Sequence, residues 1–247
     1  MGAIIGPGGN GKTILAQELA IAVASGHDIT GGVFQIRHVG PVLYFQAEDP
    51  EAVLHNRFHA LGAYLPPATR DILYEHLYLY PVVGLDSKLI DRDLSPTSFA
   101  GEVKSMATGA RLVIFDTLRR FHNLEENNSG AMSAVVGVME NISRETGAAV
   151  LFVHHANKLA LTSDTSDMQQ AIRGSSAITD NIRWQGNLAS DKESGLVRLV
   201  VAKNNYGPPT DDIWLRRERG GVLVMSQPPE EKRLKLVKPS ANLLERE

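Results

Sequence analysis

Near its start the chain carries Gly6-Pro7-Gly8-Gly9-Asn10-Gly11-Lys12-Thr13, which satisfies the phosphate-loop pattern G-x-x-x-x-G-K-[ST]. Glycines at these positions allow backbone N–H groups to close around a phosphate. An apolar run at residues 3–5 precedes the loop, and a helix-forming stretch at residues 14–24 follows it. The N-terminus of that helix would point at the same anion. We therefore predict that every residue from Gly6 to Thr13 contributes to binding a nucleoside triphosphate.

Two side chains of this loop have roles of their own in the pattern. Lys12 is expected to reach the β- and γ-phosphates, where it would also assist catalysis, and the Thr13 hydroxyl is expected to ligate magnesium. A chance glycine-rich turn is the alternative, which the flanking strand and helix disfavour. The predicted cofactors are therefore ATP and Mg²⁺.

The composition is that of an ordinary globular protein, with 247 residues of which 43% are apolar and 21% charged. The chain has no cysteine, which excludes disulfides and fits the reducing cytoplasm of a bacterium. No apolar run approaches the roughly 20 residues that span a bilayer, and no signal peptide is expected because the first residues form the nucleotide loop. The net charge of −3 argues against coating nucleic acid by bulk positive charge, but it allows basic residues that face a channel.

Strand-like and helical segments alternate along the chain. The strand-like segments are continuously apolar, which indicates burial on both faces and hence a parallel sheet between helices. We predict an α/β fold with a largely parallel central sheet, extended at its C-terminal side by antiparallel strands. Strands are expected at 41–46, 77–81, 111–116 and 147–153, helices at 51–63, 98–108 and 131–146, and the antiparallel strands at 196–202, 212–216 and 221–224.

The domain organisation is expected to be simple. Residues 1–225 are predicted to form one ATPase domain, which is a length that one hydrophobic core can serve. Residues 226–247 are charged and contain prolines, so we predict a mobile C-terminal tail.

Acidic residues follow two of the predicted strands. Four apolar residues lead into Asp116, which places it at the carboxyl edge of the sheet, where it is predicted to hold magnesium. The next residue is Thr117 and not a glutamate, so the general base must come from elsewhere. Glu48 follows the preceding strand and is predicted to be that base. Asp49 precedes a proline and is predicted to cap the next helix, and the alternative is that both acids are solvated caps.

The strand predicted at 147–153 is followed directly by the histidine pair His154-His155. We predict that His155 contacts the γ-phosphate and reports its loss to the adjoining loop. The alternative is a buried imidazole with satisfied hydrogen bonds. A metal site made of His154 and His155 is disfavoured because adjacent strand residues point to opposite faces.

Long loops follow the strands that carry Asp116 and His155, and such loops in a compact domain are usually functional. Arg119 and Arg120 of the first loop are predicted DNA contacts, with ion pairs at a subunit face as the alternative. Lys158 and Arg173, in and after the second loop, are predicted to contact DNA phosphates.

Taken together, these residues resemble the RecA-like ATPases, and within them the hexameric replicative helicases of IncQ-type broad-host-range plasmids. The resemblance extends from Gly2 to about Val224, and family members carry a further segment ahead of the phosphate-loop strand. In this sequence the phosphate loop already starts at Gly6. The fold and ATP binding are expected to be unaffected by this difference from the family. The segments that carry the resemblance are the phosphate loop, Ala47–Pro50, Phe115–His122, His154–Lys158, Arg173–Ser176, Asp180–Gln185 and Lys203–Gly207.

The resemblance implies a homohexameric ring that moves 5′→3′ on single-stranded DNA, with ATP bound between subunits and a plasmid primase and initiator as partners. It implies the roles given above for Glu48, Asp116 and His155. It also implies that Arg183 reaches the neighbour's ATP as a catalytic arginine finger. The alternative is that Arg183 only forms an ion pair beside Trp184. Arg57 and Lys203 are implied as further nucleotide contacts.

Two other functions fit the same residues. One is a RecA-type recombination or repair ATPase that forms an open filament on DNA, and the difference lies in whether subunit rotation closes a ring. The other is a regulatory ATP-binding switch that does not translocate. ATP turnover that ignores single-stranded DNA would favour the switch.

Overall fold

One nine-stranded sheet organises the computed structural model, which describes residues 1–155 and 176–230. The strand order is β3-β2-β4-β5-β1-β6-β7-β8-β9. All pairings from β3 to β6 are parallel, and those from β6 to β9 are antiparallel. The strands are β1 (Gly2–Gly6), β2 (Val42–Gln46), β3 (Leu77–Pro81), β4 (Leu112–Asp116), β5 (Ala149–His155), β6 (Trp184–Ser190), β7 (Val197–Asn204), β8 (Ile213–Arg217) and β9 (Leu223–Ser226).

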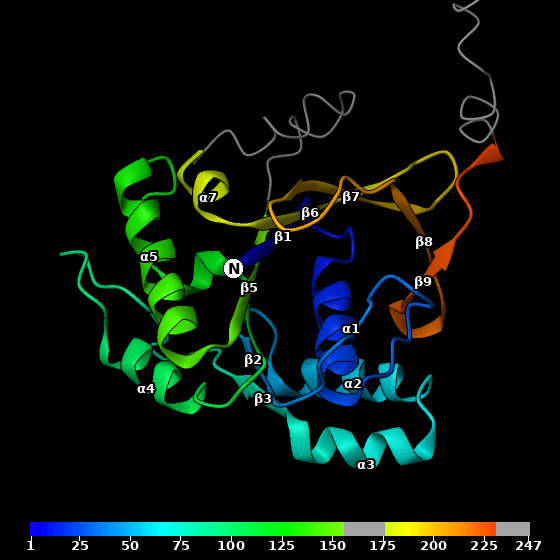
Figure 1. The fold of residues 1–247 in the computed structure, drawn as a ribbon, viewed down its shortest axis with the longest axis horizontal. Helices are drawn as coiled ribbons and strands as arrows, with labels where there is room; N and C mark the ends of the chain where they lie inside the picture. Colours follow the sequence, from blue (N-terminus) through cyan, green and yellow to red (C-terminus); the bar gives the residue numbers. More distant parts are fainter. Residues whose placement is uncertain (156–175, 231–247) are drawn as a thin grey trace, which may run out of the picture.

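Helices cover both faces of this sheet (Figure 1). One face carries α1 (Lys12–Ser25), α2 (Glu51–Gly62) and α3 (Pro67–His76), and the other carries α4 (Ser98–Met106), α5 (Ser129–Thr146) and α7 (Ser176–Asn181). Two short 3-10 helices, η1 (Leu118–Phe121) and η3 (Arg219–Gly221), follow β4 and β8. Among the helices of the described residues, none has the length and apolar character needed to cross a membrane.

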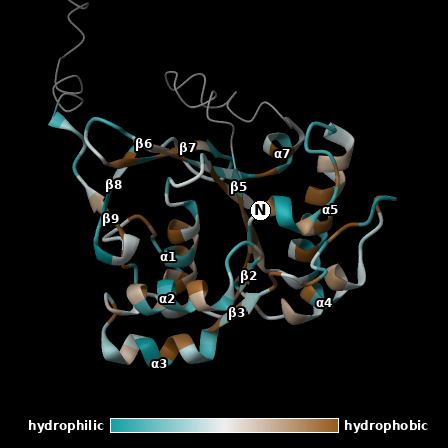
Figure 2. Cartoon of the chain, turned by 180° about the vertical axis from the view of Figure 1, so that it is seen from behind, coloured by the Kyte–Doolittle hydropathy of each residue, from teal (hydrophilic) through white to brown (hydrophobic). Residues whose placement is uncertain are grey.

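The apolar core is divided by the sheet into two layers. On β4, Phe115 packs with the residues of α4 and α5, whereas its neighbour Ile114 packs with those of α1. Phe45 of β2 stacks on Phe115 with ring centroids 5.5 Å apart. Figure 2 shows brown, apolar strands in the middle of the fold and apolar segments on the helices, with teal frequent on the outer helices and loops. The predicted α/β fold with a largely parallel sheet is confirmed.

β6 and α3 are among the elements that were not predicted from the sequence. β6 is parallel to β1, and its inward-facing Gln185 and Asn187 are polar although buried, so the segment lacks the apolar signature of a central strand. α3 has no buried residue, and it lies on the outside of α1. β9 runs to Ser226, one residue into the predicted tail, and positions 231–247 of that tail lie outside the described residues.

Glu18 of α1 is a carboxyl group buried in the contact between α1 and β9. Its Oε1 accepts a hydrogen bond from the Leu223 backbone N–H at 2.7 Å, and its Oε2 has no partner in the described part of the chain. Burial raises the pKa of Glu18 from 4.5 to about 8. Between these two values the folded protein holds a proton that the unfolded chain has released, so the free energy of unfolding falls as pH rises through this window.

Glu18→Gln should therefore remove a pH-dependent loss of stability. We expect the wild type to lose up to about 1.4 kcal/mol of unfolding free energy per pH unit at this group, whereas the neutral amide cannot titrate. Urea unfolding at pH 5, 6.5 and 8 measures the difference between the two proteins. Glu102→Gln, at an exposed position on α4, is the control. Equal declines in wild type and Glu18→Gln would show that Glu18 does not hold the proton.

Candidate nucleotide-binding and catalytic site

The phosphate loop joins β1 to α1 at the carboxyl edge of the sheet. Gly11 sits at the N-cap of α1 in the left-handed region with φ 93°, and no side chain caps the helix there. The first N–H groups of α1 are thus left for a ligand, which favours an anion. Gly6 lies so close to β6 that a Cβ atom would collide with the Leu188 carbonyl oxygen. The sequence requirement for glycine at both positions follows from this geometry.

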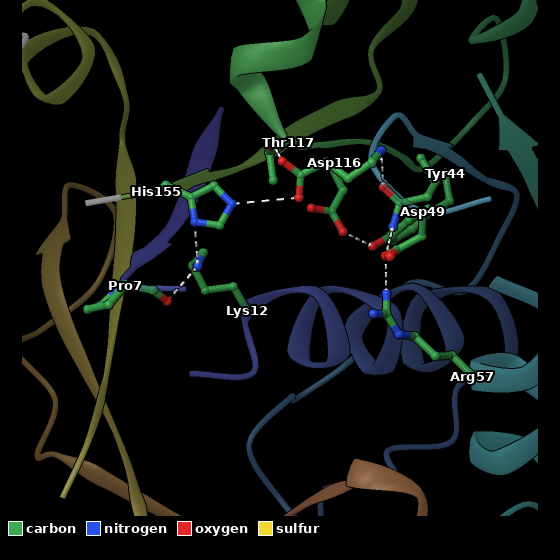
Figure 3. Close-up of polar contacts among 10 residues, drawn as sticks. Pro7, Lys12, Tyr44, Asp49, Arg57, Asp116, Thr117 and His155 are labelled. Atoms are coloured by element: carbon green, nitrogen blue, oxygen red, sulfur yellow. Dashed lines mark hydrogen bonds and ion pairs between the residues drawn. The ribbon is translucent and has the colours of Figure 1, made fainter. Parts of the chain in front are cut away.

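Lys12 is folded back over the loop that precedes it. The residue is 4% exposed, and Nζ donates a hydrogen bond to the Pro7 carbonyl at 2.8 Å and lies 3.2 Å from His155 Nδ1 (Figure 3). Burial lowers the pKa of Lys12 to about 8, although Asp116 and Glu48 act in the opposite direction. The ammonium group therefore lies where β5, the loop and α1 meet, and close to the carboxylates of the site.

Asp116 is a buried carboxylate at the end of β4. Its Oδ2 accepts a hydrogen bond from the Tyr44 hydroxyl at 2.7 Å (Figure 3), whereas Oδ1 is buried with no hydrogen-bond partner among the described residues. Burial raises the pKa of Asp116 to about 6, and the hydrogen bond from Tyr44 together with the nearby Thr13 hydroxyl opposes this shift.

The side chains of Asp116 and Thr13 are suited to binding a magnesium ion. The free Oδ1 of Asp116 and the nearby Thr13 hydroxyl are hard oxygen donors of the kind that Mg²⁺ prefers. Within the described residues, no three His, Cys, Asp or Glu side chains gather into a metal-binding group. The donors match a metal that keeps most of its ligands from water and from substrate phosphates, as Mg²⁺ does.

Glu48 lies beside Asp116 because β2 and β4 are neighbours, with Gln46 paired to Asp116. Its Oε1 accepts a hydrogen bond from the Thr117 hydroxyl at 2.9 Å, and its Oε2 is 3.6 Å from His155 Nε2. The contact with His155 lowers the pKa of Glu48, and the Thr117 hydroxyl acts in the same direction. Glu48 is thus a held carboxylate rather than a solvated helix cap, and its role as general base stays a prediction.

The two histidines at the end of β5 point to opposite faces of the strand. His154 is buried, and burial lowers its pKa to about 4. The His155 side chain is 45% exposed and bridges Lys12 and Glu48. Of the pair, His155 therefore lies among the predicted site residues, as chosen from the sequence, while its role as a sensor is untested.

Asp49 does not cap the following helix. The N-cap of α2 is Pro50, and the Asp49 carboxylate instead pairs with Arg57 and accepts a hydrogen bond from Gln46 Nε2 at 3.1 Å (Figure 3). The predicted cap is wrong because the ion pair with Arg57 takes the carboxylate. Arg57 as an ATP contact remains a prediction.

Arg183 and Lys203 lie at the amino edge of the sheet, at the other end of the strands from the phosphate loop. The Arg183 backbone N–H donates to the Met1 carbonyl at 2.9 Å, and Lys203 Nζ donates to the Thr179 carbonyl at 2.7 Å, at the end of α7. A strand length separates both residues from the loop of their own chain, so a contact with ATP would have to be made with a second subunit.

The predicted DNA contacts fall into two groups. Arg119 and Arg120 are exposed on η1, directly after Asp116 and Thr117, and Arg119 Nε lies 3.8 Å from Glu126 Oε1 of the same chain. Their contact with DNA is untested. Lys158 and Arg173 lie outside the described residues.

The sequence did not reveal several residues that hold this site together. Tyr44 lies inside the predicted strand at 41–46, where nothing marks its hydroxyl as a partner of Asp116, and no pattern marks Thr117 as a partner of Glu48. Arg217 of β8 donates through Nη2 to the Gly9 carbonyl at 2.8 Å. Asn10 is held from β6, because its Nδ2 donates to the Leu188 carbonyl at 3.3 Å. The C-terminal half of the sheet thus grips the phosphate loop from one side.

Arg217→Ala is expected to raise the KM for ATP about tenfold and to leave kcat unchanged. The lost hydrogen bond has a charged donor and holds the loop that binds the phosphates, and a tenfold change corresponds to about 1.4 kcal/mol. Arg216→Ala is the matched control, because Arg216 is adjacent but pairs with Glu218. Steady-state ATP turnover gives both constants. A fall in kcat at unchanged KM would contradict a role in holding the loop.

The sequence matches the protein family described as AAA domain over residues 1–160. Among solved structures, a DnaB-like replicative helicase, described with its interactions with primase, superposes with a TM-score of 0.65 at 15% identity. The match covers 91% of this chain and 57% of that one. The flagellar accessory protein FlaH from Methanocaldococcus jannaschii gives a TM-score of 0.55 at 13% identity over 92% of this chain and 89% of FlaH. The RadB recombinase gives a TM-score of 0.57 at 15% identity, and the match covers 92% of this chain and 90% of RadB.

These likenesses agree with the geometry of the site. At such low identity the three structures establish the fold, and this chain spans little more than half the length of the helicase chain. The family match covers most of the sequence and includes the phosphate loop, Glu48, Asp116 and His155. The chain therefore belongs to the AAA domain family, and its fold is that of a RecA-like P-loop ATPase.

Proposed function

We propose that this chain hydrolyses ATP to drive movement along single-stranded DNA, as the motor subunit of a ring-shaped bacterial helicase. The observation that carries hydrolysis is the position of Glu48. Its carboxylate lies at the sheet edge beside Asp116, in contact with Thr117 and His155. A carboxylate held in this way beside a phosphate loop can accept the proton of an attacking water.

Each site residue has one task in this proposal. The loop from Gly6 to Thr13 binds the phosphates through its N–H groups, and Lys12 neutralises charge on the β- and γ-phosphates. Thr13 and Asp116 hold Mg²⁺, which supplies further charge neutralisation when bound. His155 contacts both Lys12 and Glu48, so loss of the γ-phosphate would be felt at its imidazole.

Assembly into a homohexamer is supported by two observations. The fold likeness to a DnaB-like replicative helicase is the strongest of the three by TM-score. Arg183 and Lys203 lie at the opposite sheet edge from the phosphate loop, as expected of groups that act on a neighbour's ATP. Arg57, Arg119, Arg120, Lys158 and Arg173 complete the proposed nucleotide and DNA contacts. A plasmid primase and initiator are the proposed partners, and 5′→3′ is the proposed direction.

Arg183→Ala should lower the ATP turnover of assembled subunits and leave that of isolated subunits unchanged. We expect turnover of the assembled variant to fall to the rate of isolated subunits, because a finger from the neighbour stabilises charge on the transferring phosphoryl group. ATP affinity should not change. Turnover measured above and below the assembly concentration is the test, with the exposed Arg144→Ala as control. Wild-type turnover by assembled Arg183→Ala would exclude the finger.

The RadB likeness favours a second candidate, a recombination-type ATPase in an open filament on DNA, because the match covers 90% of the RadB chain. Mass by light scattering, together with ATP turnover with and without single-stranded DNA, distinguishes the candidates. A mass near six subunits with DNA-stimulated turnover supports the ring. A mass that grows with the length of the DNA supports the filament. ATP turnover that does not change when DNA is added supports a regulatory switch.

A further inference from the structure

A cavity of about 530 Å³ opens at the amino edge of the sheet, away from the phosphate loop. Its floor is formed by the first residues of β1, β4, β5 and β6, which lie side by side in the sheet order. Leu19 and Val23 of α1 and the segment 35–38 form its walls. The volume falls within the range of small-molecule sites. Nothing in the proposed hydrolysis of ATP within one chain uses this cavity.

The charge around the cavity is of one sign. Arg37, Arg111 and Arg183 line it together with His38, and no aspartate or glutamate does. None of the three guanidinium groups has a hydrogen bond or ion pair to another described residue. The whole chain carries a net charge of −3, so this local excess of positive charge runs against the average. A concave, one-sign lining attracts an anion, and planar guanidinium groups match phosphate oxygens.

The remaining lining is apolar and aromatic. Leu112, Val150 and Leu151 contribute aliphatic surface, and Trp184 and Tyr206 contribute rings. Trp184 lies against β1, because a Cβ atom added to Gly2 would be 3.3 Å from Trp184 Cε3, so its ring packs in the floor. Tyr206 is 83% exposed at the rim. Aromatic rings beside cations form a surface on which nucleobases stack.

We propose that this cavity binds one nucleotide unit, with its base on Trp184 and Tyr206 and its phosphate on Arg37, Arg111 and Arg183. The unit comes either from a free mononucleotide or from a strand of single-stranded DNA, and both present the same base and phosphate. This site is separate from the phosphate loop and does not depend on the proposed motor function. It shares Arg183 with the proposed subunit contact, so Arg111 is the residue to test.

The experiment uses the full chain without an N-terminal tag, because Met1 lines the cavity. Lys12→Ala removes binding at the phosphate loop, and Trp214→Phe leaves Trp184 as the sole tryptophan of the two in the sequence. Quenching of Trp184 fluorescence is followed on titration with AMP and, separately, with a short thymidine oligonucleotide. Adding Arg111→Ala removes one phosphate contact, and Arg92→Ala changes an exposed arginine that does not line the cavity.

We expect saturable quenching that Arg111→Ala weakens at least tenfold and Arg92→Ala leaves unchanged. Saturation by AMP identifies a free nucleotide as the source, and saturation by the oligonucleotide alone identifies DNA. Absence of saturable quenching with both probes overturns the proposal, as does equal affinity with and without Arg111. ATP turnover by Arg111→Ala with Lys12 intact is measured in parallel, so failure of this site is distinguished from failure of the ATPase.

Discussion

Glu48→Gln is expected to bind ATP with wild-type affinity and to lose turnover by about 10²–10⁴-fold, the usual contribution of a general base. The amide keeps the shape of the side chain and can still accept the hydrogen bond that Thr117 donates at 2.9 Å. It cannot accept a proton from water. Binding is measured with a fluorescent ATP analogue, and turnover is measured by phosphate release.

The control for this change is Glu51→Gln, an exposed glutamate at the first residue of α2. It should leave both binding and turnover unchanged. Near-wild-type turnover by Glu48→Gln would remove Glu48 as the base. Loss of ATP binding in Glu48→Gln would indicate instead that the carboxylate holds the loop in place through His155 and Lys12.

Lys12→Ala is expected to abolish ATP binding at the phosphate loop. The ammonium group is buried and charged, and removing such a partner from a desolvated charge contact costs about 2–5 kcal/mol. The lower bound of that range alone weakens affinity about 30-fold. Loss of the cation also removes a positive charge that acts on both Asp116 and Glu48.

Calorimetric titration of ATP with Mg²⁺ measures this effect. Lys104→Ala is the matched control, because Lys104 pairs with Glu145 on the side of the sheet that carries α4 and α5. Its affinity for ATP should equal that of the wild type. Tight ATP binding by folded Lys12→Ala would contradict the assignment of the loop.

Much of the fold could be predicted because its central strands are continuously apolar. Residues 112–116 carry four apolar residues before Asp116, and both faces of this strand are buried. β6 was not predicted because its buried Gln185 and Asn187 are polar. They form a 2.8 Å hydrogen bond with each other where a typical central strand would bury apolar side chains. Hydropathy cannot detect a strand whose interior is polar and paired.

The site could be predicted where parallel topology alone decides it. The carboxyl ends of β2, β4 and β5 meet at one edge, which brings Glu48, Asp116 and His155 together. Contacts that depend on tertiary packing were missed. Tyr44 meets Asp116 across 72 positions, and Arg217 meets Gly9 across 208, so no local pattern marks either residue.

Strand displacement tests the proposed motor most directly. The substrate is a labelled partial duplex with a 5′ single-stranded tail, supplied with ATP and Mg²⁺, and a 3′-tailed duplex and Glu48→Gln serve as controls. We predict ATP-dependent release of the labelled strand by the wild type from the 5′-tailed substrate alone, and none by Glu48→Gln. ATP turnover by the assembled wild type on these substrates without release of any strand would contradict a helicase motor.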